Sequence, residues 1–276
     1  MHGLLVQLSD THIRRPGQLA YRRVDTSAFL AQAVASVLAL PQPATAVVVT
    51  GDLTDFGRPE EYAQLRALLA PLSCPVYLLP GNHDDRAELR RAFVEHRYLF
   101  QSDESWVQYA VDLGGLRLVA IDTTVARAPH GELDNEQLEW LAETLAQDQT
   151  TPTIVAMHHP PFATFIGHMD DIGLQSGGRE LAEVVARNRQ VERIICGHLH
   201  RSIQARFAGT IAQTAPSTAH AVSLDLANDA ASEFMMEPPG FLVHAWSSTG
   251  QVTSHVAFTG SFAGPFPFHD QGALID

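Results

Sequence analysis

The sequence predicts an α/β fold in which two mixed β-sheets pack face to face and are flanked by helices. Short apolar runs alternate with helical-period segments over residues 4–79, and a second series of the same kind spans residues 106–196. Mainly strand-like runs follow. Because 276 residues suffice for one large core, we expect a single domain over residues 1–276.

The first series contains three short apolar runs with the length and composition of buried strands, at residues 4–8, 46–50 and 76–79. Residues 24–40 and 60–69 lie between them and carry apolar side chains at helical spacing. This order predicts a parallel sheet with crossover helices. Such a sheet binds ligands beyond the carboxyl ends of its strands.

The second series begins with a predicted strand pair that turns at Gly114-Gly115, over residues 106–111 and 116–121. Helices are expected over 135–145 and 179–187, and further strands over 153–157, 191–196, 204–207, 211–214, 241–246 and 252–258. Residues 223–239 show neither period. We expect a loop or a small cap or dimerisation segment there.

Charge and hydropathy narrow the range of partners. The net charge of -13 disfavours binding of a nucleic-acid polymer. No apolar run reaches the roughly 20 residues that a membrane helix needs, and the first residues lack the basic region of a secretion signal. We therefore expect a cytoplasmic protein that is not bound to a membrane. The sequence has no lysine, so phosphate charge must be neutralised by metal, histidine or arginine.

Polar residues follow five of the predicted strands directly. Glycines accompany several of them and allow the sharp turns that point side chains inward. Aspartate, asparagine and histidine are typical ligands of borderline divalent metals. The segments are Ser9-Asp10-Thr11-His12, Gly51-Asp52, Gly81-Asn82-His83-Asp84, His158-His159 and Gly197-His198-Leu199-His200.

The ordered pattern Asp-x-His, Gly-Asp, Gly-Asn-His-Asp, His and Gly-His-x-His resembles that of the calcineurin-like metallophosphoesterase superfamily. Within it, the chain is most similar to the bacterial class III cyclic-nucleotide phosphodiesterases and, closer still, the glycerophosphodiesterases. This finer similarity extends through residues 57–62 and the carboxyl-terminal strands. The resemblance implies the four-layer sandwich of that superfamily, with its metal site at the carboxyl ends of the strands.

The resemblance also implies a ligand set for two divalent metal ions, which could be iron, manganese, zinc or cobalt. A hydroxide shared by the two metals would attack the phosphorus atom. The implied ligands are Asp10, His12 and His200 for one metal, Asn82, His158 and His198 for the other, and Asp52 as the bridge between them.

Further histidines are expected around this centre. The resemblance implies that His83 stands near the leaving group as a general acid or electrostatic stabiliser, and that His220 lines the substrate side. His220 could equally be an ordinary loop histidine. Asp84 could orient the His83 imidazole or cap a helix. We expect His159 to be structural or to support a ligand, and His168 could reach the mouth of the site.

The function expected from these features is hydrolysis of a small phosphodiester, either a glycerophosphodiester or a cyclic nucleotide. A phosphomonoesterase is the first alternative, although the additional phosphate charge calls for cationic groups that are scarce near the motifs. A non-catalytic metal-binding module of the same fold is the second. The similar glycerophosphodiesterases assemble through a cap region, which implies a dimer or higher homo-oligomer.

Overall fold

The computed structural model describes residues 3–103, 105–247 and 249–275. One sheet has five strands in the order β15-β14-β1-β2-β3. Strands β1, β2 and β3 are parallel, and β14 and β15 extend the sheet antiparallel. Their bounds are β1 Gly3–Leu8, β2 Ala46–Thr50, β3 Val76–Leu79, β14 Gly240–Trp246 and β15 Val252–Phe258.

The other sheet has six strands in the order β10-β11-β9-β7-β5-β4. Its four central strands are parallel, and the two edge strands run antiparallel to their neighbours. The bounds are β4 Tyr109–Asp112, β5 Arg117–Ala120, β7 Thr153–Ala156, β9 Val191–Cys196, β10 Gln204–Phe207 and β11 Thr210–Thr214.

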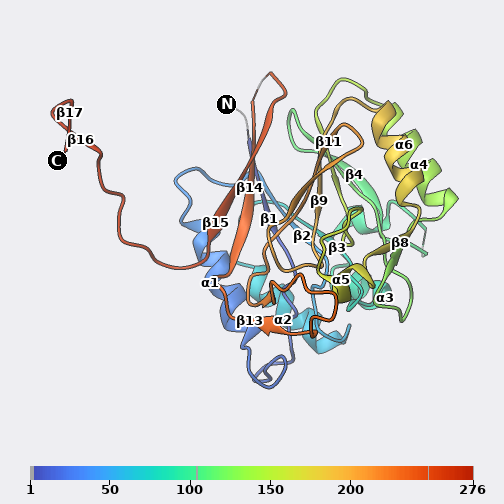
Figure 1. Ribbon diagram of the computed structural model, residues 1–276, viewed down its shortest axis with the longest axis horizontal. Helices are drawn as coiled ribbons and strands as arrows, with labels where there is room; N and C mark the ends of the chain where they lie inside the picture. Colours follow the sequence, from blue (N-terminus) through green and yellow to red (C-terminus); the bar gives the residue numbers. More distant parts are fainter. Residues whose placement is uncertain (1–2, 104, 248, 276) are drawn as a thin grey trace.

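The core shows how these sheets pack. Leu118 and Ala120 of β5 belong to the same buried cluster as Leu5 of β1, whereas Val119 between them belongs to a second cluster with Leu141. Alternate residues of a strand face opposite sides, so one face of this sheet packs on the first sheet and the other packs on helices. Helices α4 (Asn135–Ala146) and α6 (Gly178–Arg187) cover that outer face (Figure 1).

Helices α1 (Thr26–Leu38) and α2 (Pro59–Leu69) contribute buried side chains to the cluster around the first sheet. The arrangement is therefore two mixed sheets with helices flanking them, which confirms the predicted fold class. Five predicted strands have the observed bounds, and the other predicted helix and strand bounds differ from the observed ones by at most three residues. The helix expected from residue 24 begins at Thr26, because the Asp25 side chain accepts a hydrogen bond from the Ala28 amide and caps it.

Helix α3 (Arg86–Ala92) follows the loop in which Asp84 was expected either to orient His83 or to cap a helix. Several other short elements were not predicted, because they are too short to show a period. They are the 3₁₀ helix Arg97–Phe100, α5 (Gly167–Asp170), and three two-stranded pairs. These pairs are β6 (Gly131–Glu132) with β8 (Leu174–Ser176), β12 (Ala221–Val222) with β13 (Phe234–Met235), and β16 (His269–Asp270) with β17 (Ala273–Leu274).

Two segments of the carboxyl-terminal quarter, residues 223–239 and 259–275, lie outside the two main sheets. Strand β13 is the one paired element that the structure describes within residues 223–239, and it joins the segment to β12. After β15, residues 259–275 extend away from the two sheets and end in the β16–β17 pair (Figure 1). No helix among the described residues has the length and apolar character to span a membrane.

Candidate metal centre

The structure brings the seven predicted ligands together beyond the strand ends. Asp10 and His12 follow β1, Asp52 follows β2, Asn82 follows β3, His158 follows β7, and His198 and His200 follow β9. Both sheets therefore contribute, and the site spans the junction between them. This is the position expected for ligands of an α/β sheet.

The loops after β1 and β2 continue the pairing of their strands. The amides of Asp10 and His12 donate to the carbonyls of Gly51 and Asp52, at 3.1 and 2.9 Å. Asp10, His12 and Asp52 have positive φ angles of 52°, 42° and 48°. Non-glycine residues rarely adopt this left-handed conformation. Such backbone strain is typical of functional sites.

Glycine is required where these loops approach one another. A Cβ atom on Gly81 would lie 2.2 Å from the Asp52 amide nitrogen, which is closer than any real contact. Gly51 has a φ of 90°, and a Cβ atom there would lie 2.2 Å from His158 Nδ1. The two glycines thus let the strand ends come close enough for their ligands to share one site.

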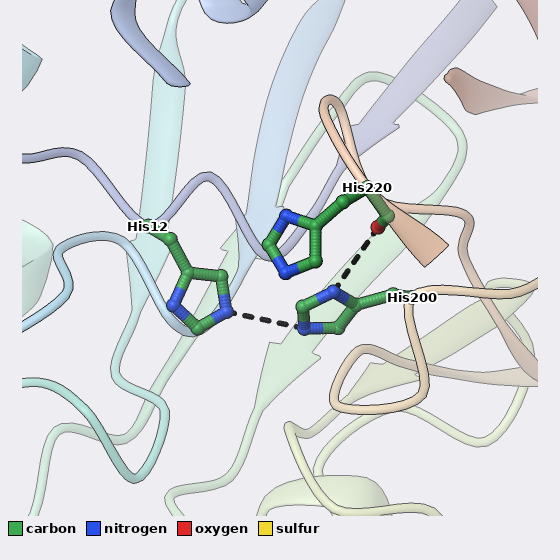
Figure 2. Close-up of side chains that lie close together, drawn as sticks. All are labelled: His12, His200 and His220. Carbon is green, nitrogen blue, oxygen red and sulfur yellow. Dashed lines mark hydrogen bonds between the residues drawn. The ribbon is translucent and has the colours of Figure 1, made fainter. Parts of the chain in front are cut away.

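One half of the centre is formed by Asp10, His12, Asp52 and His200, whose ligand atoms lie within 4.8 Å of one another. His12 Nε2 lies 3.1 Å from His200 Nε2, and His200 Nε2 lies 3.6 Å from Asp10 Oδ1. Figure 2 shows these two rings with their nitrogens facing each other and the His220 ring beside them. Two nitrogens that converge in this way can hold a single cation.

The other half contains Asn82, His158 and His198. His158 Nε2 lies 3.1 Å from Asn82 Oδ1, and the rings of His158 and His198 are 5.2 Å apart. Asp52 connects the halves, because its Oδ2 lies 3.5 Å from His12 Nε2 and its Oδ1 lies 3.5 Å from His158 Nε2. The geometry therefore places Asp52 where a bridging carboxylate would stand.

Backbone carbonyls fix the orientation of two ligand histidines. His158 Nδ1 lies 2.8 Å from the Thr50 carbonyl, and His200 Nδ1 lies 3.1 Å from the His220 carbonyl (Figure 2). In a neutral imidazole, the ring nitrogen that faces a carbonyl carries the proton, so the lone pair lies on Nε2. Both Nε2 atoms point into the site as potential metal ligands.

Burial controls the charge of the histidines. It lowers the pKa of His198 to about 3, and it lowers the pKa of His200 well below the usual value, with nearby imidazoles adding to both effects. These rings are neutral, which is the form that binds metals. Burial also lowers the pKa of His158, but the adjacent Asp52 carboxylate outweighs it and raises that pKa to about 9 without metal.

The carboxylates respond in opposite ways. Burial raises the pKa of Asp10 to about 6, and the negative charge of Asp52 adds to this effect. Burial would raise the pKa of Asp52 too, but His158 and His83 hold it well below its usual range. Asp52 is therefore the ionised carboxylate at the centre of the cluster.

Two buried ligand atoms need a partner that the protein does not provide. Among the described residues, Asp10 Oδ2 and His198 Nε2 have no hydrogen-bond partner. An unpaired buried polar atom costs about 1–3 kcal/mol, so each such atom requires an explanation. Divalent cations would be the missing partners of these two atoms, because oxygen and nitrogen donors of this type bind borderline metals. The residues present thus fit a two-metal site.

His83 lies beside the centre with its side chain 35% exposed. Its Nδ1 lies 2.9 Å from the Asp55 carbonyl, and its ring is edge-on to that of His12 at 4.7 Å. Asp84 was expected to orient this imidazole or to cap a helix. Instead, the Asp55 carbonyl makes the orienting contact, and Asp85 caps α3 by accepting from the Glu88 amide.

Asp84 organises the surrounding loops. Its carboxylate accepts hydrogen bonds from the amides of Leu53, Thr54 and Gly81 and from the Tyr62 hydroxyl, at 2.9–3.0 Å. These bonds join the loop after β2 to the loop after β3. Asp84 therefore supports the backbone that carries Asp52 and Asn82.

A cavity of about 430 Å³ opens over the centre, and His83, His168 and His220 line it together with Tyr21 and Phe234. His220, expected on the substrate side, and His168, expected near the mouth, are thus both lining residues of this cavity. Burial lowers the pKa of His220 to about 3, so this ring is neutral.

His159 is fully buried and is not among the residues that line the cavity. Its Nδ1 lies 2.8 Å from Thr123 Oγ1, and its Nε2 lies 3.2 Å from the Pro129 carbonyl. Protein groups thus occupy both ring nitrogens, as expected of a structural residue.

Three residues near the site were not singled out from the sequence. Asp55 contacts His12 and His83, and Tyr21 and Phe234 pack with the His220 ring at 5.2 and 5.3 Å. The spacing of Asp55, three residues after Asp52 in the same loop, is a signal that could have pointed to it. Tyr21 lies in the loop between β1 and α1 and Phe234 in strand β13, and no sequence pattern connects them.

Seven side chains with nitrogen or oxygen donor atoms converge at the junction of the two packed sheets. The Asp52 carboxylate lies between the two halves of this group. This is the arrangement of a two-metal hydrolase site. The chain belongs to the calcineurin-like phosphoesterase family, whose model matches residues 4–202. The resemblance inferred from the motifs is thereby confirmed.

Several similar proteins carry phosphodiesterase names. A probable glycerophosphodiester phosphodiesterase GpdQ of Arcobacter nitrofigilis is 35% identical over 274 residues, which is 99% of this chain and all of that protein. A cAMP/cGMP dual specificity phosphodiesterase of Mycobacterium tuberculosis is 35% identical over 81% of this chain and 70% of its own length. A dimetal phosphatase from Danio rerio shares the fold, with a TM-score of 0.63 at 16% identity over 94% of this chain and 99% of that one.

Proposed function

We propose that this protein is a metal-dependent phosphodiesterase that hydrolyses small phosphodiesters. The observation that carries the proposal is the position of Asp52, whose two oxygens each face a histidine of a different half of the centre at 3.5 Å. Two divalent cations bound there would activate water and neutralise the charge on the phosphoryl oxygens. We propose the seven ligands expected from the motifs as the residues that would hold these cations, with Asp52 lying between the two halves.

Residues around the centre would orient the substrate and assist the leaving group. The Asp55 carbonyl holds the proton on His83 Nδ1, so His83 Nε2 is free to face the leaving oxygen. A protonated Nε2 there would donate its proton or stabilise the developing negative charge. His220 also lines the cavity and would contact the substrate there.

The cavity favours a diester over a monoester. Histidines line its inner part, and no arginine lines it among the described residues. A phosphate monoester carries one more negative charge than a diester, and cationic side chains usually neutralise that charge. Turnover of bis(p-nitrophenyl) phosphate should therefore exceed turnover of p-nitrophenyl phosphate. A strong preference for the monoester would overturn the diesterase proposal.

Glycerophosphodiesters and cyclic nucleotides are the substrate classes that we propose to test first. The names of the similar proteins point to both. The similarity to the GpdQ relative spans 99% of this chain, whereas that to the mycobacterial enzyme spans 81%, so glycerophosphodiesters come first. A panel of both classes, assayed with fully metal-loaded protein, would separate them. Metal-loaded protein without turnover on any diester would favour a non-catalytic binding module.

We propose two divalent metal ions, each of which could be iron, manganese, zinc or cobalt, because the candidate ligand atoms are nitrogen and oxygen. Metal analysis of protein purified without added chelator would identify them and give their stoichiometry.

We further propose that the protein forms a homo-oligomer through residues 223–239 and the terminal segment 259–275. Large apolar side chains are exposed in both, including Leu224 and Met236 in the first and Phe262, Phe266 and Phe268 in the second. Exposed apolar groups at this density are typical of contact surfaces. Light scattering of the protein should show a dimer or larger oligomer. A variant truncated after residue 258 should form an oligomer with fewer subunits than the full chain.

A cytoplasmic location is also proposed, because Cys74 and Cys196 are both free thiols and free thiols are typical of reducing compartments. Cell fractionation would test it.

A further inference from the structure

A second cavity, of about 560 Å³, is lined by three arginines, Arg189, Arg193 and Arg206, and we call it the arginine cavity. It shares no lining residue with the cavity over the metal centre. Arg193 lies near the amino end of β9, whereas His198 and His200 follow the carboxyl end of that strand. Because a strand rises about 3.3 Å per residue, Arg193 and His198 are about 17 Å apart along the chain.

The strand register places two of these arginines in one row. Arg206 of β10 pairs with Ile211 of β11, and Ile211 pairs with Arg193 of β9. Paired residues of neighbouring strands point to the same face, and the strands are about 4.8 Å apart, so the two arginine Cα atoms are separated by about 10 Å. Side chains as long as arginine can converge on one ligand across this distance. Ile211 lies between them and is 36% exposed.

The three guanidinium groups have no carboxylate partner. Within the part of the chain that the structure describes, none of them forms an ion pair, and the side chains of Arg189 and Arg206 make no hydrogen bond. Arg187, only two residues before Arg189, does pair with Glu183. Among the described residues, Glu192 is the one acidic residue that lines the cavity. Positive charge is therefore concentrated here, although the net charge of the chain is -13.

Arg193 is held in place by the protein itself. Its Nη1 donates to the Glu192 carbonyl at 2.6 Å, and its Nη2 donates to the Val252 carbonyl at 3.0 Å. Carbonyls fix the guanidinium without neutralising it. Burial lowers the pKa of the nearby His244, and the positive charge of Arg193 adds to this effect. A cation that is already ordered loses less conformational freedom when it binds an anion than a mobile side chain does.

A phosphate group suits this arrangement chemically. Guanidinium groups donate pairs of N–H bonds to phosphate oxygens, and a phosphate dianion would balance two of the three positive charges. The cavity volume is in the range of small-molecule sites. Ile211 offers apolar surface to an organic part of the ligand. A nucleic-acid polymer is disfavoured, because the rest of the acidic surface would repel it.

We propose that the arginine cavity is a second binding site, separate from the metal centre, for a small phosphate monoester. The dianionic phosphate group would lie between Arg193 and Arg206 over Ile211, and Arg189 would add a third positive charge. The proposal goes beyond the proposed function and does not depend on it, because the two cavities have no residue in common.

The test is calorimetric titration of the metal-loaded protein with three probes: inorganic phosphate, glycerol 3-phosphate and adenosine 5′-monophosphate. One bound equivalent should persist after the metals are removed, since the arginine cavity contains no metal ligand. Arg189→Gln and Arg206→Gln should each weaken this equivalent at least about tenfold, because each removes a charge-assisted hydrogen bond. Tighter binding of the two monoesters would identify the organic ester as the ligand, and equal affinity for all three probes would identify the phosphate group alone.

Arg187→Gln is the matched control. It removes the same charge two residues from Arg189, but Arg187 pairs with Glu183 and does not line the cavity. Binding in this variant should stay within about twofold of wild type at 0.15 M salt, where exposed charges are largely screened. Arg189 and Arg206 are exposed, so their replacement should leave the fold intact, which thermal unfolding checks.

Absence of a bound equivalent in metal-free wild type, or wild-type affinity in both Arg189→Gln and Arg206→Gln, would overturn the inference. Equal weakening in Arg187→Gln would overturn it too, because that result would indicate a diffuse effect of charge. The proposed function fails in a different way. Metal-loaded wild type that hydrolyses no diester would refute the phosphodiesterase proposal while anion binding at the arginine cavity remained.

Discussion

Gln7 Nε2 donates a hydrogen bond to the Cys196 carbonyl at 2.9 Å, and this bond joins strand β1 of one sheet to strand β9 of the other. The same nitrogen donates to Thr50 Oγ1, and Gln7 Oε1 lies 3.1 Å from His244 Nε2. All of these groups are buried. A polar network therefore crosses the interface between the sheets directly behind the metal centre.

Replacement of Gln7 by alanine should destabilise the protein by about 3 kcal/mol, because each buried polar group left without a partner costs about 1–3 kcal/mol. Urea unfolding of the metal-free protein measures this loss. Gln204→Ala on the exposed edge strand β10 is the matched control and should change stability by less than about 0.5 kcal/mol. Equal stability of the two variants would show that the network contributes little.

His244 makes stability depend on pH. Burial, together with the nearby positive charge of Arg193, lowers the pKa of His244 to about 3 in the folded chain. The unfolded chain has the ordinary value near 6.5 and binds the proton first. Stability should therefore be highest above pH 6.5 and fall as pH drops below it, by up to about 1.4 kcal/mol per pH unit from this group.

The measurement is urea unfolding of metal-free protein between pH 7.5 and 5. His244→Gln should reduce the slope, since glutamine does not titrate, and His269→Gln should not, since His269 is exposed. Other buried histidines titrate in both proteins, so the difference between the curves isolates His244. Identical slopes in wild type and His244→Gln would contradict the assignment.

The adjacent histidines His158 and His159 should have separable roles. His158→Ala should lose about one equivalent of bound metal, because His158 Nε2 faces Asp52 and Asn82. His159→Ala should keep both equivalents and lose about 2 kcal/mol of stability, because both nitrogens of that ring contact protein groups. Metal analysis and urea unfolding of the two variants distinguish these outcomes. Loss of metal from His159→Ala at unchanged stability would reverse the assignment.

His83→Ala should lower kcat by about 10²- to 10⁴-fold for diesters with poor alcohol leaving groups. The loss should be much smaller for p-nitrophenolate, which leaves without a proton. The dependence of rate on leaving-group pKa is the measurement, with His130→Ala as a control because His130 pairs with Glu132 and does not line the cavity. An equal loss for both leaving groups would indicate that His83 acts on binding and not on departure of the alcohol.

The sequence alone was sufficient to predict the two-sheet fold and the convergence of the ligands. Each ligand directly follows an apolar strand, as Asp52 follows β2 and His198 follows β9. Strand period and strand order are local properties of the chain, and the carboxyl ends of parallel strands meet at one edge. Short elements such as α5 escaped prediction because four residues show no reliable period.

Only the tertiary structure decided which group holds each histidine. The partner of His12 is Asp55, 43 residues away in sequence, and the carbonyl that holds His83 belongs to the same residue. Asp84, which directly follows His83, bonds to other loops. Proximity in sequence is a poor guide here because the register between β1 and β2 sets which loop atoms meet. That register depends on the packing of the whole sheet and not on any local pattern.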